Sequence, residues 1–321
     1  MAVVDLGTNT TRLLVCDVHD DEIAELERRT TITGLGQGVD ANGRLADAAK
    51  DRVRDALGEF RELIDRHGAA RTTAVATSAM RDAEDGEAFR QEICERFGIA
   101  AQTISGAEEA RLTFRGATGG NSPGREPTLV LDIGGGSTEY VIGAGGGEPD
   151  FEVSMRAGSV RQTERHLNDD PPTPEGLHAL AAEVRGLIAG EVPERLLAEV
   201  ESGIAVAGTA TSLAAISQQL EPYDSARVHR FRLELGEAER ILAMLAALPV
   251  AERREVAGLH PDRAATIVAG AVILVESIRA FGLDEMQVSE ADLLHGAALE
   301  AAGAAADPER TSADGSSLRR K

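Results

Sequence analysis

Two stretches of this sequence, one in each half of the chain, follow the same pattern. VVDLGTNTTRLLV from Val3 and VLDIGGGSTEYVI from Val130 align without a gap, so that Asp5 matches Asp132. In each stretch an apolar run ends at an aspartate, a short polar turn follows, and a second apolar run returns, which is typical of a β-hairpin. Further along each half, AVATS from Ala74 is similar to AVAGT from Ala205. The repeat predicts two copies of one β-hairpin-plus-βα unit.

The periodicity of apolar residues along the rest of the chain predicts an α/β protein in two halves. Helices are expected over about residues 46–67, 85–97, 107–118, 159–166, 174–190, 211–219 and 291–305, a mainly helical stretch over 236–281, and further strands over 22–33, 72–76, 101–104, 151–155, 204–207 and 286–289. Residues 119–127 are rich in Gly, Pro, Asn and Ser, as a linker is. We therefore expect domains over 1–124 and 125–306, with the last helix a candidate to pack back on the first domain. The polar tail, 307–321, is expected to be disordered.

Charge and cysteine usage limit the partners and the compartment. The formal net charge of −21 repels nucleic acid and anionic membranes, so neither is expected as a main partner. Cys16 and Cys94 are the only cysteines and have no metal-type spacing. No basic segment followed by an apolar one opens the chain, and the most apolar run, Ile267 to Val275, is too short to cross a bilayer and is expected to be a buried helix. We expect a cytoplasmic protein.

The second hairpin, DIGGGSTE, combines groups that suit phosphate and a divalent cation. Its glycines let the backbone approach an anion and point N–H groups at it. Asp132 and Glu139 lie across the hairpin and could hold Mg²⁺ through oxygen ligands and water. A glycine-rich turn with solvated acids is the alternative for one such loop. The matching turn over Asp5 to Thr11 supplies a second anion-binding loop, which favours a charged ligand between two domains.

Several other polar residues are candidates for chemistry, each with a structural alternative. In SGAEEARLTF, Ser105 and Glu108 form a capping box, which leaves Glu109 free to take a proton from water. Arg81, Arg156 and Arg161 could neutralise phosphate oxygens, although an exposed arginine is the commoner case. Gly208 and Thr209 could bind phosphate at the start of a helix or simply cap it.

Several common enzyme classes are disfavoured by what the sequence lacks. The seven histidines have no metal-ligand spacing, which argues against a zinc site. There is no nucleophile elbow, no Walker loop and no GxGxxG unit, and serine-hydrolase chemistry is therefore disfavoured as well.

With these residues in view, the sequence resembles the exopolyphosphatase/guanosine pentaphosphate phosphatase (Ppx/GppA) family. The resemblance covers Val3 to about Ala301 and is carried by DLGTNTTRLLV, ATSAMRDAEDG, ISGAEEARLTFRG, LVLDIGGGSTEYVIG, SMRAGSVR and VAGTATSLAA in this order. It implies a duplicated actin-like fold, of the ribonuclease H-like sugar kinase/actin/chaperone ATPase superfamily, with an interdomain cleft. It also implies the short form of the family, without a C-terminal helical module, and dimers.

The resemblance assigns roles to residues that match the family motifs. Glu109 matches the catalytic base and Arg81 the arginine that faces the substrate phosphates. Asp132 and Glu139 match the Mg²⁺-linked acids, with Asp5 a further candidate. The phosphate-binding turns correspond to Thr8, Asn9, Thr10, Gly134, Gly135, Gly136, Ser137, Thr138, Gly208 and Thr209. One departure is Leu294-His295-Gly296, where many members carry an arginine and a glutamate before the glycine, and this leaves chain-length preference open.

We therefore expect a Mg²⁺-dependent exopolyphosphatase that releases terminal phosphate from inorganic polyphosphate. The alternatives are a phosphohydrolase of guanosine pentaphosphate at the same site, a kinase of the same superfamily, and a sensor of alarmone or polyphosphate without turnover. Because the surface is acidic and the substrate is a polyanion, K⁺ or high salt is also expected to assist activity by screening their repulsion.

Overall fold

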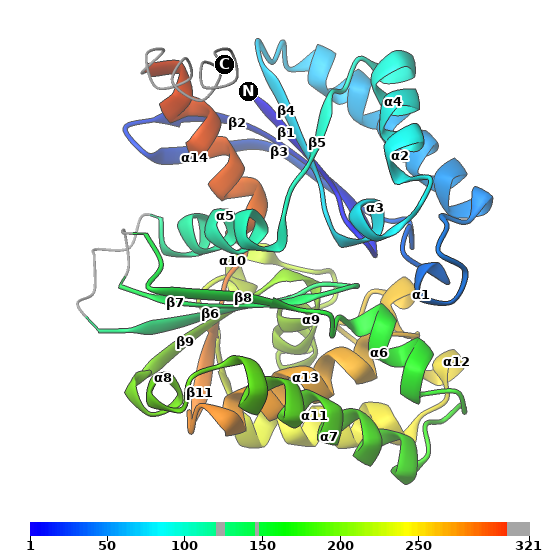
Figure 1. The fold of residues 1–321 in the computed structure, drawn as a ribbon, viewed down its shortest axis with the longest axis vertical. Coiled ribbons are helices and arrows are strands. Elements are labelled where there is room, and N and C mark those ends of the chain that lie inside the picture. Colours follow the sequence, from blue (N-terminus) through cyan, green and yellow to red (C-terminus); the bar gives the residue numbers. More distant parts are fainter. Residues whose placement is uncertain (120–125, 145–147, 307–321) are drawn as a thin grey trace, which may run out of the picture.

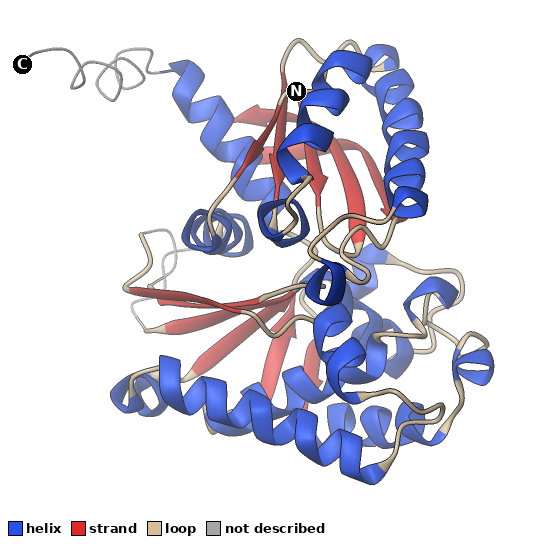
Figure 2. Ribbon diagram, turned by 45° about the vertical axis from the view of Figure 1, so that its right-hand side comes forward, coloured by secondary structure: helices blue, strands red, loops and turns tan. Residues whose placement is uncertain are grey.

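Two α/β halves lie one above the other in the computed structural model, which describes residues 1–119, 126–144 and 148–306 (Figure 1). The expected domain boundary at residues 124 and 125, most of the expected linker, and the tail over 307–321 lie outside the described residues. Each half contains one mixed sheet with helices packed against it (Figure 2).

The N-terminal half is built on a five-stranded sheet in the order β3-β2-β1-β4-β5. Its elements are β1 (Ala2–Leu6), β2 (Thr10–His19), β3 (Glu22–Ile32), α1 (Val39–Asn42), α2 (Asp47–Arg66), β4 (Thr72–Ala76), α3 (Ser78–Asp82), α4 (Gly86–Phe97), β5 (Ala101–Thr103) and α5 (Gly106–Thr118). The apolar face of α2, which carries Val53, Leu57, Phe60 and Ile64, joins the core formed with β1 and β2. β1 pairs antiparallel with β2 and parallel with β4.

The C-terminal half repeats this topology with one strand added, in the order β10-β11-β9-β6-β7-β8. Its elements are β6 (Thr128–Ile133), β7 (Thr138–Gly143), β8 (Phe151–Met155), α6 (Ser159–His166), α7 (Pro174–Glu191), α8 (Glu194–Glu199), β9 (Ser202–Val206), α9 (Ala207–Ser217), α10 (Ser225–Val228), β10 (Arg232–Glu234), α11 (Leu235–Ala247), α12 (Val250–Arg253), a 3₁₀ turn (Pro261–Arg263), α13 (Ile267–Ala280), β11 (Glu285–Val288) and α14 (Leu293–Ala306). β6 pairs antiparallel with β7 and parallel with β9, as β1 does with β2 and β4. The predicted duplication is therefore present in the fold.

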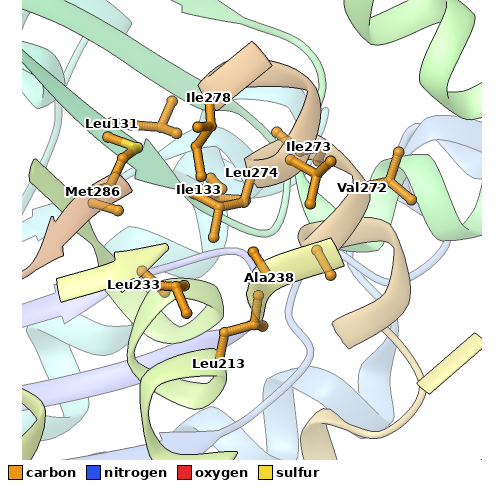
Figure 3. Close-up of a cluster of buried hydrophobic side chains, with 14 of the residues drawn as sticks. Leu131, Ile133, Leu213, Leu233, Ala238, Val272, Ile273, Leu274, Ile278 and Met286 are labelled. Atoms are coloured by element: carbon orange, nitrogen blue, oxygen red, sulfur yellow. The ribbon is translucent and has the colours of Figure 1, made fainter. Parts of the chain in front are cut away.

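The core of the C-terminal half surrounds α13. Figure 3 shows Leu274 and Ile278 of this helix beside Leu131 and Ile133 of β6, in a cluster that includes residues of α9, α11, β10 and β11. Nearly every residue of α13 is buried, because α7, α9, α11 and the sheet all pack against it. This explains the apolar run in the sequence, and within the described residues no helix is long and apolar enough to cross a membrane.

Three details differ from the sequence prediction. α9 begins at Ala207 rather than near Thr211, so the predicted start of this helix was wrong by one turn. The short strand β10 and the short helices α1, α3, α8 and α10 were not predicted, because none is long enough to show a clear periodicity. The mainly helical stretch consists of α11, α12, the 3₁₀ turn and α13.

α14, the last element that the structure describes, leaves the C-terminal half and packs against α5, β1 and β2 of the N-terminal half (Figure 1). Its contact with α5 is made by glycines that allow the two backbones to touch. A Cβ atom on Gly116 would lie 1.9 Å from the carbonyl oxygen of Asp292, and one on Gly296 would lie 1.8 Å from that of Leu112. Neither position has space for a side chain, because the neighbouring atoms belong to the backbone.

This contact predicts that Gly296→Ala lowers stability although alanine is the better helix former. Forcing the helices apart is expected to cost about 1–3 kcal/mol, more than the roughly 1 kcal/mol that Ala gains over Gly in a helix. Gly303→Ala in the same helix is the matched control, because only the end of the Arg115 side chain, 4.0 Å away, lies near its Cβ position. Urea denaturation should show Gly296→Ala less stable and Gly303→Ala unchanged or more stable than the wild type. Equal shifts of the two variants would contradict the close contact.

Candidate active site

The two repeated hairpins end in turns of the same geometry. The amide of Gly7 donates to the carbonyl oxygen of Thr10 at 2.9 Å, and the amide of Gly134 donates to that of Ser137 at 3.0 Å. These bonds join equivalent positions of the two copies. A Cβ atom on Gly7 would lie 2.7 Å from the carbonyl oxygen of Thr10, which explains why glycine opens the first turn.

The two turns lie side by side and together line a cavity of about 780 Å³. A Cβ atom added to Gly135 would lie 3.1 Å from the side chains of Thr8 and Asn9, so the turns are in contact. The cavity is lined by most of the predicted site residues, namely Asp5, Thr8, Asn9, Thr10, Glu109, Asp132, Gly134, Gly135, Gly136, Ser137, Gly208 and Thr209. Side chains and turns from both halves of the chain therefore meet in one place.

Three predicted site residues are not among those that line the cavity. The hydroxyl of Thr138 is buried and donates to the carbonyl oxygen of Ala157 at 2.8 Å. Glu139 lies on the same strand, where its Oε1 accepts a bond from Ser154 Oγ at 2.7 Å. Arg81 lies behind Glu109, with Nη1 bonded to the carbonyl oxygen of Ile104 at 2.7 Å and 3.6 Å from Glu109 Oε2. Of these contacts, the one between Arg81 and Glu109 reaches a residue that lines the cavity.

The centre of the site is a group of buried carboxyl groups. Asp132 and Glu139 are direct cross-strand partners, and Glu109 projects from the first turn of α5. Burial, and then repulsion from Glu139, Asp132 and Asp5, raises the pKa of Glu109 well above its ordinary value. Burial and the same kind of repulsion raise the pKa of Asp132 to about 8. The site therefore concentrates carboxyl groups whose mutual repulsion the nearby arginines offset only in part.

The donors around this group fit a hard cation. Oδ1 of Asp5 and Oε2 of Glu109 are buried and have no hydrogen-bond partner. Within residues 1–119, 126–144 and 148–306, no set of three or more His, Cys, Asp or Glu side chains is arranged to hold a metal ion on its own. Mg²⁺ is usually bound through one or two carboxylates, with water and substrate phosphate completing the shell. The oxygen-only chemistry and the unpaired oxygens are consistent with that mode.

Arg12 is a site residue that the sequence argument missed. Its Nε donates to Asp5 Oδ2 at 2.8 Å, and its Nη1 contacts Asp292 Oδ2 at the start of α14. Arg12 occupies the position in the first hairpin that Glu139 occupies in the second. The pairing of Asp5 with Arg12 could have been predicted from the hairpin register, because the tight turn places these two residues opposite each other. The first copy is therefore partly neutralised and the second copy is anionic.

The start of α9 forms the far wall of the cavity. Ala207 has φ 63°, a left-handed conformation that costs a non-glycine residue about 1 kcal/mol. A Cβ atom on Gly208 would lie 1.7 Å from Arg263 Nη1, so the arginine side chain covers this position and would have to move for any larger residue. Arg263 itself lines the cavity, and burial lowers its pKa to about 10. No sequence signal pointed to Arg263, because it is distant from Gly208 along the chain and belongs to no repeated motif.

The structure places Arg156 and Arg161 away from the cavity lining. Arg161 is buried and contacts Asp40 and Asp82, and Arg156 Nη2 lies 3.2 Å from Asp82 Oδ2. The sequence suggested that both arginines neutralise phosphate, but in the structure both pair with aspartates of the N-terminal half. The capping box of Ser105 and Glu108 is confirmed, with Glu108 N 3.2 Å from Ser105 Oγ.

Comparison with known proteins gives one consistent result. The sequence model of the Ppx/GppA phosphatase family matches residues 14–304. Exopolyphosphatase 2 of Mycobacterium tuberculosis is 38% identical over 94% of this chain and 98% of its own length. The crystal structure of the Aquifex aeolicus Ppx/GppA family member matches with TM-score 0.79 at 28% identity over 95% of this chain and 98% of that one. The structure of an exopolyphosphatase from Cytophaga hutchinsonii matches with TM-score 0.82 at 27% identity over 94% and 97%. These neighbours share the expected duplicated actin-like fold.

Proposed function

This chain belongs to the Ppx/GppA phosphatase family and is a phosphohydrolase of the exopolyphosphatase type, and we propose that its reaction is Mg²⁺-dependent release of terminal phosphate from inorganic polyphosphate. The observation that carries the proposal is the buried carboxyl group of Glu109, which lines the cavity beside the two turns and has one oxygen without a hydrogen bond. Such a group can take a proton from a water molecule that attacks a phosphoryl group held by the turns.

Each group around Glu109 has a role in this reaction. The guanidinium of Arg81, 3.6 Å from Glu109 Oε2, favours the ionised carboxylate and partly offsets the effect of its acidic neighbours. The backbone amides and hydroxyls of the two turns, with Thr8 and Ser137 among them, would hold the terminal phosphate in place. Catalysis of this kind depends mostly on positioning and charge neutralisation.

The residues that would hold Mg²⁺ are Asp132 and Glu139, with the unpaired Oδ1 of Asp5 as a further donor. Bound there, the ion would supply positive charge against the phosphate oxygens. The hydrogen bonds from Thr113 to Asp132 and from Ser154 to Glu139 would keep the two carboxyl groups oriented.

A second candidate substrate is guanosine pentaphosphate, acted on at the same site. The cavity extends beyond the turns to a wall that includes Leu220, Tyr223, Val256 and Leu259, and this wall could accept a nucleoside. Linear polyphosphate has no apolar group to place there, so the wall is the observation that favours the alternative.

The experiment that tests the proposal compares phosphate release from long-chain polyphosphate, guanosine pentaphosphate and ATP, each with and without Mg²⁺. We expect Mg²⁺-dependent release from polyphosphate. Release from guanosine pentaphosphate alone would move the assignment to the second candidate. No release from any substrate, with folded protein and Mg²⁺ present, would exclude both candidates.

Salt is expected to increase activity on polyphosphate. The protein carries a net charge of −21, and screening at moderate ionic strength weakens its repulsion of a polyanion before it weakens contacts inside the cavity. We expect kcat/KM to rise about threefold between roughly 10 and 200 mM KCl. Tetramethylammonium chloride at equal ionic strength separates screening from a specific K⁺ effect. A steady fall in activity from low millimolar KCl upward would contradict the screening argument.

A further inference from the structure

A group of ion pairs joins the two halves on one side of the cleft. The α6 latch, as we call it, consists of Arg156, Arg161, Glu164 and Arg165 from the C-terminal half and Gly38, Asp40 and Asp82 from the N-terminal half. Arg161 Nη2 lies 2.7 Å from Asp82 Oδ2, and Arg165 Nη2 lies 3.0 Å from Asp40 Oδ2. Arg161 also contacts Asp40, and the amide of Gly38 donates to Glu164 Oε1 at 2.9 Å.

The latch lies across the cleft from the points where the chain passes between the halves. Those crossings run from α5 to β6 and from β11 to α14, and the ion pairs of Arg12 with Asp292 and of Arg28 with Glu290 lie beside the second crossing. In Figure 1, α1 and α6 are together on the right, whereas α5 and α14 are on the left. The latch is therefore where contacts must break if the halves separate about the crossings.

Arg161 differs from the other members because it also contacts the phosphate-binding turn. Its side chain is 5% exposed, and its Nε donates to the carbonyl oxygen of Gly136 at 2.8 Å. Asp82, which it binds across the cleft, follows Arg81 directly in α3. The guanidinium of Arg161 thus connects the second phosphate-binding turn to α3, the helix that carries Arg81. A fixed, fork-shaped group of donors suits this task, and lysine cannot reproduce it.

We propose that Arg161 is a positioning residue, and that the α6 latch holds the second phosphate-binding turn against the N-terminal half so that substrate meets both turns at once. This inference rests on the proposed function for its kinetic consequence, but not for its structural one. A phosphate chain that contacts both turns favours the latched arrangement, so substrate binding and latch closure support each other. Loss of the latch weakens binding, while saturating substrate still assembles the site.

The kinetic test uses phosphate release by Arg161→Met and Asp40→Asn, with Arg185→Met as control. Arg185 makes an ion pair of similar length with Glu276, 2.9 Å, but within the C-terminal half. We expect KM to rise about tenfold in Arg161→Met and severalfold in Asp40→Asn, with kcat within about threefold of the wild type, and both constants unchanged in the control. In the double variant, KM should rise by less than the product of the two single increases, because both substitutions remove the same contact.

A purely structural role gives a different pattern. If Arg161 only stabilises the fold, its loss lowers the fraction of active enzyme, so kcat falls in proportion while KM stays the same. That result, or independent effects in the double variant, would overturn the proposal. Asp40→Asn keeps the test valid if Arg161→Met does not fold, because the Asp40 side chain is partly exposed and its replacement is nearly isosteric.

A distance measurement tests the latch without any substrate. Cys94 on α4 is exposed and Cys16 is buried, so a spin label can be attached to Cys94 and to a second cysteine introduced as Glu194→Cys on α8. Pulsed electron resonance should give one narrow distance in the latched protein and in Arg185→Met, and a broader or longer distribution in Arg161→Met. An unchanged distribution in Arg161→Met would overturn the latch whether or not phosphate release is detected, whereas loss of the proposed function alone would leave this difference intact.

Discussion

Glu109→Gln is expected to lower kcat for phosphate release by about 10²- to 10⁴-fold, the range that general-base catalysis contributes. The amide keeps the size of the side chain but cannot accept the proton of the attacking water. The pKa of Glu109 is raised, so this carboxylate is a stronger base than an ordinary one once it is ionised. The substitution also removes a buried group that repels Asp132 and Glu139, so the variant should fold and be at least as stable as the wild type. Single-turnover phosphate release and thermal unfolding measure the two effects.

The control for this variant is the neighbouring residue. Glu108 completes the capping box with Ser105, and its Oε2 accepts a bond from the Ser105 amide at 2.8 Å. Glu108→Gln should therefore change kcat less than about threefold and reduce stability by no more than roughly 1 kcal/mol. If Glu108→Gln lost as much activity as Glu109→Gln, the loss would come from disturbance of α5 and the assignment of the base would be wrong.

The fold was predictable because its strongest determinants are local. Each tight turn fixes a hairpin register, and the register fixes which residues face the core, so the repeat at Val3 and Val130 predicted the β-hairpin-plus-βα unit that both sheets share. The hairpin register also predicted that Asp132 lies opposite Glu139. The start of α9 was missed because Ala207 and Gly208 read as a turn, and the arginine that covers this turn is distant in the sequence.

The contacts that join the halves were not predictable for a related reason. Arg161 binds Asp40 and Asp82, which lie far earlier in the chain, and no periodicity links such positions. From the sequence alone, an arginine beside the turn that follows the strand at 151–155 was a candidate to neutralise phosphate. Only the placement of Asp40 and Asp82 on the facing half shows that its charge is already neutralised.

The difference between the two copies explains where the chemistry is concentrated. Duplication would place an acidic pair at each hairpin, but the first copy has Arg12 where the second has Glu139. Arg12 neutralises Asp5 and is itself held by Asp292, so the first turn can bind an anion without a cation. The second turn keeps both acids, Asp132 and Glu139, and it is there that the proposed Mg²⁺ would bind. The two turns share one geometry but differ in charge, so the first is suited to bind an anion directly and the second to bind it through a cation.

Without Mg²⁺, the protein is expected to lose stability as the pH rises from about 5.5 to 8.5. Burial and repulsion raise the pKa of Asp132 from its ordinary value to about 8, and raise those of Asp5, Glu109 and Glu139 as well. An acid whose pKa is higher in the folded state favours folding below its unfolded pKa, and this contribution is lost as the pH rises through the folded value. We expect at least about 2 kcal/mol, or roughly 5 °C in melting temperature, across this range.

Adding about 10 mM Mg²⁺ is expected to restore most of this loss at pH 8.5 and to have little effect at pH 5.5, because only the ionised carboxylates bind the ion. Asp132→Asn should flatten the pH dependence, remove most of the Mg²⁺ effect and abolish phosphate release. Asp65→Asn is the matched control, because Asp65 is an exposed partner of Arg61 on α2 and lies outside the cavity. Thermal unfolding at the two pH values, with and without Mg²⁺, checks all three proteins. If the stability of the metal-free wild type rose with pH, or if Mg²⁺ stabilised Asp132→Asn as much as the wild type, the four carboxyl groups would not form the charged, ion-dependent centre inferred from their burial.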